Sequence, residues 1–248
     1  MAIKSYMSKV IVSGDIVEFY EYDSPVLIGY EDTKKDSNGR EVEANEENKK
    51  INRAKALTRA RRDLRRLVNS NINKYDIESK FVTLTFSAHV TTFEVANYEF
   101  KKFRQRLEYE LGFKLKYVVV PEFTKIGRIH FHLVMFNIPF IRNSKLQGIW
   151  SNGFIKINKI DSVNNVGAYV CKYITKANTD VRLQGKKCYF SSRGLYKPIE
   201  IIDKNRVANL MVALPVCSLT YANTFENEYN KTIYKQYNMS KLKIEDVK

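Results

Sequence analysis

Two histidines stand at alternate positions of one short apolar stretch of this chain, and a carboxylate precedes them. Residues 121–136 read PEFTKIGRIHFHLVMF, which places His130 and His132 eight and ten residues after Glu122. A turn with Gly127 in its left-handed position joins two strands here and pairs Glu122 with His130. Because side chains alternate between the faces of a strand, we expect all three to lie on one face.

Two imidazoles and a carboxylate that converge from paired strands are ligands for a divalent metal ion. A mixed set of this kind suits Mg²⁺ or Mn²⁺ when phosphate oxygens complete the coordination shell, and a zinc hydrolase site is also open. The competing interpretation makes His130 and His132 ordinary residues of a buried strand. The match with Glu122 favours the metal.

A second candidate lies on a predicted helix over residues 163–177, whose valines and isoleucine recur at helical spacing. Two tyrosines and two lysines share another face of it: Tyr169, Tyr173, Lys172 and Lys176. A phenol is a poor nucleophile until its proton is removed or its charge is stabilised. The lysines would provide such stabilisation. Alternatively, the tyrosines pack beneath a sheet and the lysines extend into solvent.

The charge of the protein favours a polyanionic partner, because 42 Lys and Arg residues outnumber 27 Asp and Glu residues and leave a formal charge of +15. Residues 48–66 hold nine basic side chains and one acidic one. One stripe of this predicted helix consists of Lys55, Arg59, Arg62 and Arg66. Such side chains contact phosphates and position nucleic acid without reading its sequence, although a solvated helix face would look the same.

Other patterns exclude several classes. The three cysteines have neither metal-site spacing nor the even count of a disulfide framework. The sequence has no Walker-type phosphate loop, no signal peptide and no apolar run long enough to span a bilayer. We therefore expect a soluble protein of the cytoplasm.

Taken together, the motifs resemble the HUH endonucleases, and among them the rolling-circle replication initiators of small single-stranded-DNA phages and bacterial plasmids. The matching segments, in order, are FVTLTF at 81–86, HFH at 130–132, YVCKYITK at 169–176 and SSRGLYKP at 191–198. The last contains Arg193 and Lys197, which we add to the expected DNA contacts. The paired tyrosines resemble the two-tyrosine subclass.

The resemblance implies a mechanism. Metal held by His130, His132 and Glu122 polarises a phosphate of single-stranded origin DNA, and one tyrosine attacks it. The products are a 5′-phosphotyrosine and a free 3′-OH, which primes a host DNA polymerase. The other tyrosine later cuts the regenerated origin, and the new 3′-OH closes a circle. Because the chain has no helicase motif, unwinding falls to a helicase of the bacterial host.

The expected fold is α+β, with a central antiparallel sheet of about five strands and flanking helices, as the resemblance implies. We divide the chain into an N-terminal hairpin and polar loop (1–46), a basic helix (47–78), an endonuclease core (79–204) and a C-terminal extension packed on that core (205–248). Two alternatives stay open: a relaxase or transposase of the same superfamily, and a non-catalytic DNA-binding protein.

Overall fold

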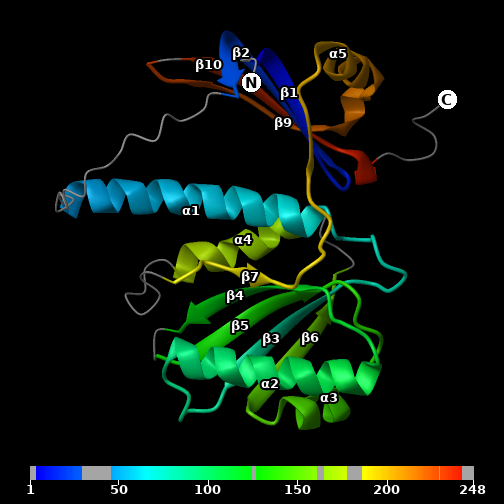
Figure 1. Ribbon diagram of the computed structural model, residues 1–248. Helices are drawn as coiled ribbons and strands as arrows, with labels where there is room; N and C mark the ends of the chain where they lie inside the picture. Colours follow the sequence, from blue (N-terminus) through cyan, green and yellow to red (C-terminus); the bar gives the residue numbers. More distant parts are fainter. Residues whose placement is uncertain are drawn as a thin grey trace. The chain divides into compact units, whose positions relative to one another are not determined.

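The computed structural model describes residues 4–29, 46–124, 127–160, 165–177, 186–228 and 230–241, and the chain in it divides into two compact units. One unit comprises residues 1–53 and 198–248, and the other comprises residues 54–197. Each unit is built around a five-stranded antiparallel sheet (Figure 1). The predicted α+β class with a five-stranded antiparallel sheet is confirmed.

The sheet of residues 54–197 has the strand order β6-β3-β5-β4-β7. Its strands are β3 (Lys80–Phe86), β4 (Tyr117–Phe123), β5 (Ile129–Met135), β6 (Gly153–Lys159) and β7 (Phe190–Ser191). The helices are α1 (Glu46–Asn69), which enters this unit at residue 54, α2 (Phe93–Leu111), α3 (Asn143–Trp150) and α4 (Val166–Ala177). Helices α2 and α3 cover one face of the sheet, and α4 lies against the other (Figure 1).

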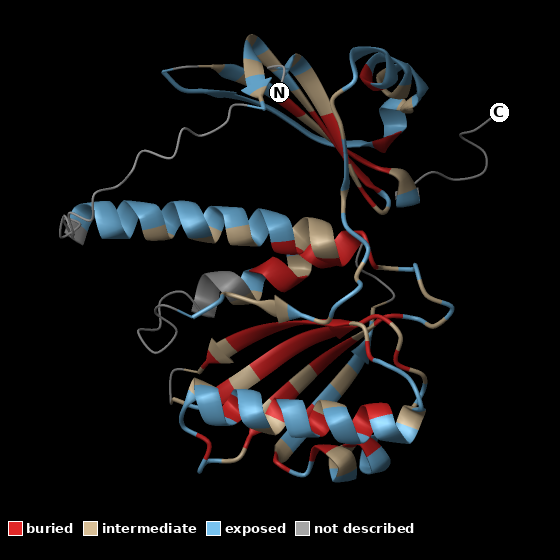
Figure 2. Ribbon diagram, in the orientation of Figure 1, coloured by how far each residue is buried: buried red, intermediate tan, exposed pale blue. Residues whose placement is uncertain are grey.

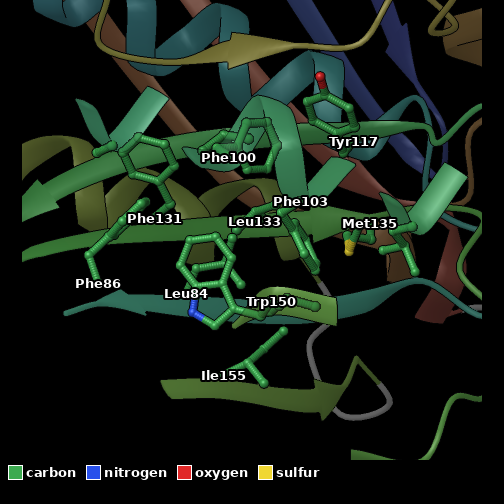
Figure 3. Packing of buried hydrophobic residues seen from close by; sticks show 14 of the residues in the cluster. Leu84, Phe86, Phe100, Phe103, Tyr117, Phe131, Leu133, Met135, Trp150 and Ile155 are labelled. Carbon is green, nitrogen blue, oxygen red and sulfur yellow. The ribbon is translucent and has the colours of Figure 1, made fainter. Parts of the chain in front are cut away.

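The face beneath α2 and α3 holds the larger core. Alternate residues of the strands point into it, and Phe86, Phe131 and Trp150 are almost completely buried there. Phe86 meets both other rings edge-on, with ring centroids 4.9 Å apart in each pair (Figure 3). The indole nitrogen of Trp150 donates to the carbonyl oxygen of Thr85, 3.2 Å away, which ties α3 to β3.

The opposite face of the sheet carries a smaller core shared with α4 and the C-terminal part of α1. Leu64 and Val68 of α1 and Val170 of α4 are fully buried in it. The N-terminal part of α1 is mostly exposed, as Figure 2 shows, and Ile51 of the predicted apolar stripe is 45% exposed. Only the last turns of the basic helix therefore contribute to this core.

The hairpin between β4 and β5 has the predicted register. Glu122 pairs with His130, and Phe123 pairs with Ile129. The amide of Thr124 donates to the carbonyl of Arg128 at 2.8 Å, and Gly127 has φ 82°. A left-handed residue at this point closes a three-residue loop, and glycine adopts that conformation without steric cost.

The start of α2 differs by one residue from a Thr91–Glu94 capping box. Thr92 is the N-cap, and its hydroxyl accepts from the amide of Val95 at 3.4 Å. Glu94 instead pairs with Lys186. Adjacent threonines are equivalent as caps in sequence terms, and the choice follows from which of them leaves the helical path.

The other unit pairs the two ends of the chain. Its strand order is β8-β1-β2-β10-β9, and α5 packs against β1. The elements are β1 (Lys4–Ser13), β2 (Ile16–Ile28), β8 (Ile199–Ile201), α5 (Lys204–Ala213), a 3₁₀ turn (Val216–Ser218), β9 (Leu219–Glu226), β10 (Lys231–Asn238) and a last 3₁₀ turn (Met239–Lys241).

This pairing revises the predicted division of the chain. We assigned residues 205–248 to an extension of the core, but β10 pairs with β2 of the N-terminal hairpin. The predicted boundaries at 46/47, 78/79 and 204/205 differ from the observed ones at 53/54 and 197/198. Most of the predicted polar loop lies outside the described residues. Among the helices of the described ranges, none is long and apolar enough to cross a bilayer.

Helices α1 and α4 meet through Gly167. Its amide donates to Oδ1 of Asn69 at 2.9 Å, and a Cβ at this position would lie 2.3 Å from the carbonyl oxygen of Arg65. Nδ2 of Asn69 in turn donates to Asn165 at 3.0 Å. The first turn of α4 is thereby fixed against the last turns of α1.

We expect Gly167→Ala to destabilise the protein by about 1–3 kcal/mol, because the new methyl group forces the two helices apart. Urea denaturation followed by circular dichroism measures the change. The control is Gly148→Ala in α3, where a Cβ meets nothing within 4 Å. It should be neutral or stabilising by about 0.5–1 kcal/mol. A Gly167→Ala protein as stable as the parent would contradict this packing.

Candidate functional site

The predicted metal ligands lie on the sheet face that α4 partly covers. In one row across the strands, Thr85 of β3 pairs with His130, and His130 pairs with Glu122 of β4. In the next row, Thr83 pairs with His132. Directly opposed residues share a face, so the two histidines and Glu122 point to the same side, as the sequence predicts.

His132 is held through both ring nitrogens. Its Nε2 lies 2.5 Å from Oε2 of Glu122, and its Nδ1 lies 3.3 Å from the hydroxyl of Thr83. The His132 side chain is 7% exposed and that of Glu122 is 14% exposed. A short, mostly buried carboxylate–imidazole contact with a second partner behind the ring fixes the ring's orientation.

Helix α4 brings the predicted tyrosines directly over this histidine. The ring of Tyr173 stacks on that of His132, with centroids 3.7 Å apart and planes 22° from parallel. The hydroxyl groups of Tyr169 and Tyr173 lie 3.4 Å apart. The structure therefore joins two motifs that stand about 40 residues apart in the sequence.

Phe81 of β3 supports the cluster from the side of the sheet. Its ring lies parallel to that of Tyr173 at 5.6 Å and meets that of Tyr169 edge-on at 5.5 Å. It also lies 6.0 Å from the His132 ring. Phe81 is buried, so it forms the floor on which both tyrosines and His132 rest.

The environment shifts the pKa of two groups in this cluster. Burial, followed by the neighbouring His132, lowers the pKa of His130 below its usual value. Burial raises the pKa of the Tyr173 hydroxyl, and the hydrogen bond with Tyr169 and the charge of Glu122 raise it further. Tyr173 is thus a protonated phenol at neutral pH, and Glu122 acts electrostatically on it.

The donor set fits a divalent metal in chemistry, although the structure holds its atoms in other contacts. Within the described ranges no group of three or more His, Cys, Asp and Glu side chains is arranged as a metal cluster. Nε2 of His132 and Oε2 of Glu122 already face each other, and the His130 ring lies 6.2 Å from the His132 ring on the same face. A metal ion would replace the proton in the contact between His132 and Glu122, with His130 as the third donor.

The predicted lysines are placed in part. The ammonium group of Lys172 is exposed and lies 5.2 Å from the centroid of the Tyr169 ring, within cation–π range. Lys176 is in the last turn of α4, but its side chain lies outside the described part of the protein.

The predicted DNA-contacting residues of α1 form an exposed basic stripe. Lys55, Arg59 and Arg62 are exposed, and Arg66, nearer the buried end of the helix, is half-buried. Arg62 also hydrogen-bonds the neighbouring Asp63 at 3.2 Å. The stripe lies on the helix that holds α4 through Gly167, and not on the sheet face with the histidines.

Arg193 and Lys197 are exposed in the connection that follows β7, at the far edge of the sheet from β6. Buried Asn71 anchors this connection: its Nδ2 donates to the carbonyl of Tyr196 at 2.9 Å, and its Oδ1 accepts from the Tyr196 amide at 3.0 Å. These two basic residues therefore lie beside the end of α1, apart from the cluster around His132.

Three contributors to the site were absent from the sequence prediction: Phe81, Thr83 and Asn69. The first two lie on the correct face of FVTLTF, but their partners depend on which residues of β3 and β5 are opposed. Asn69 acts through α1, which the sequence identifies only as a basic helix. An alternating pattern in β3 was the one available signal.

The comparison with protein families matches residues 79–178 to the family of replication-associated proteins of the ORF2 type. The matched region runs from the start of β3 to the end of α4, so it includes every residue of the His–Tyr cluster. No curated protein and no solved structure matches the chain. The part of the chain that carries the site is therefore similar to replication-associated proteins, and it is somewhat less than half of the sequence.

Proposed function

We propose that this protein initiates rolling-circle replication by nicking and joining single-stranded origin DNA through a 5′-phosphotyrosine intermediate. The observation that carries the proposal is the stack of Tyr173 on His132, because it places two phenols beside the only His/His/carboxylate set on the sheet face of the described residues. The similarity of residues 79–178 to replication-associated proteins supports it.

In the proposed first step, the phenol oxygen of Tyr169 or Tyr173 attacks the phosphorus atom of one phosphodiester. The P–O3′ bond breaks, the 5′ end stays on the tyrosine, and the 3′ oxygen leaves with the proton that the phenol gives up. A bound Mg²⁺ or Mn²⁺ ion would polarise the phosphate and offset the negative charge of Glu122 beside Tyr173. Lys172 stabilises negative charge near Tyr169.

The second tyrosine allows the reaction to be reversed on a new strand. The free 3′-OH primes a host DNA polymerase, while a host helicase opens the duplex. When the origin is copied, the unused phenol cuts it, and the released 3′-OH attacks the first phosphotyrosine. One phosphodiester bond forms for each phosphotyrosine broken, so joining needs no ATP.

Metal binding tests the proposed ligands apart from any DNA. We expect isothermal titration of wild-type protein with Mn²⁺ to show one site that His130→Ala/His132→Ala weakens at least about 10-fold, since two of three donors are lost. The control is His89→Ala, which changes the one remaining histidine, exposed and outside the site. Equal Mn²⁺ affinity in the wild-type and double-alanine proteins would contradict the assignment.

Covalent adducts test the nucleophiles. Oligonucleotides that tile both strands of the DNA flanking the gene are incubated with protein and Mn²⁺, then resolved on a denaturing gel. We expect an adduct with one oligonucleotide, retained in part by Tyr169→Phe and by Tyr173→Phe and absent from the double variant.

The matched control is Tyr109→Phe on α2, whose ring is 92% exposed on the other side of the sheet and should not affect the adduct. An adduct that survives in the double variant would refute the choice of nucleophiles. Binding of DNA without an adduct on any strand would instead favour a non-catalytic DNA-binding protein.

A further inference from the structure

The open part of the site face carries an exposed aromatic ring in line with the histidines. Phe154 of the edge strand β6 pairs with Thr85, which pairs with His130, which pairs with Glu122. Directly opposed residues share a face, so the ring of Phe154 lies on the same side of the sheet as the His–Tyr cluster. Two strand spacings, roughly 10 Å, separate it from His130.

Phe154 is 60% exposed, whereas its neighbour Ile155 is fully buried on the opposite face. A single exposed apolar residue is common on protein surfaces and by itself indicates nothing. Phe154 differs because a basic residue follows on the same face. Lys156 is exposed and pairs with Thr83, which pairs with His132, so it occupies the corresponding place in the next row.

The backbone holds this part of β6 firmly against β3. Gly153 has φ 129°, and a Cβ there would lie 2.2 Å from the carbonyl oxygen of Thr85. The amide of Ile155 donates to the side chain of Gln147 at 3.0 Å. The ring of Phe154 is therefore presented from a fixed strand, which limits the entropy lost when a ligand stacks on it.

We infer that Phe154 and Lys156 form a binding subsite for the single-stranded DNA that leads to or from the scissile phosphate, with Phe154 stacking on a base and Lys156 contacting a phosphate. The inference rests on the proposed function for the position of the scissile phosphate. Proteins that bind single strands without sequence preference combine aromatic platforms with basic side chains in this way. The excess of positive charge favours such an occupant over an apolar protein partner.

The test measures binding without cleavage, in the Tyr169→Phe/Tyr173→Phe background. The probe is a 5′-fluorescein-labelled dT20 oligonucleotide, and fluorescence anisotropy gives its Kd. We expect Phe154→Ala to raise Kd by roughly 5- to 100-fold, the range that loss of one stacked base produces. Phe140→Ala is the control, since that ring is 84% exposed on a loop beyond β5, and it should leave Kd unchanged.

Phe154→Trp provides a readout that does not depend on the alanine variant folding. It should keep the parent affinity, and its added fluorescence should be quenched by dT20, because the only other tryptophan, Trp150, is buried. Lys156→Ala should reduce the slope of log K against log salt by about 0.7, the value for one phosphate contact to a single strand. Lys101→Ala on α2 should not change that slope.

The outcomes separate this subsite from the proposed reaction. A Phe154→Ala protein that binds dT20 as the parent does, or an unquenched Phe154→Trp, overturns the subsite and leaves the nicking reaction standing. Failure of the parent to bind dT20 also overturns it. Weakened binding with quenching supports the subsite even if no covalent adduct forms with any strand, and in that case only the proposed reaction fails.

Discussion

The stack of Tyr173 on His132 is the contact on which the rest of the site depends. With ring centroids 3.7 Å apart, it joins a helix to a strand that the chain reaches some 40 residues earlier. The contact needs a ring on each side that cannot rotate. Glu122 and Thr83 hold the histidine through its two nitrogens, and Phe81 lies beneath the tyrosine.

Helix α4 can occupy this place because α1 holds its first turn from outside. Gly167 allows the backbone of α1 to approach, and Asn69 accepts the amide that the start of α4 leaves unpaired. The basic helix thus has two parts with different roles. Its last turns belong to the core, and its earlier turns display Lys55, Arg59 and Arg62 to solvent.

The local parts of this structure were predictable from sequence, and the long-range parts were not. Gly127 determines the β4–β5 turn, and the turn determines that Glu122 opposes His130, so a few adjacent residues contain the whole argument. The opposition of Thr83 and His132 has no such local signal, because α2 and β4 lie between those strands. The pairing of β2 with β10 joins residues more than 200 positions apart, which no periodicity reports.

The site explains why a phenol with a raised pKa needs help before it can attack. Burial, Tyr169 and Glu122 all favour the protonated form of Tyr173. Any nucleophilic role for it requires positive charge close to Glu122, and the two histidines are on the same face to help bind such a charge. The proposed metal and the proposed nucleophile are therefore one hypothesis in electrostatic terms.

Peptide mapping of a covalent DNA adduct tests the central claim most directly. Trypsin cuts after Lys172 and so separates a peptide with Tyr169 (160–172) from one with Tyr173 (173–176). We predict that mass spectrometry after nuclease digestion finds a nucleotide joined through its 5′-phosphate to the tyrosine of one of these two peptides. An adduct confined to any other peptide, or joined through a 3′-phosphate, would contradict the account.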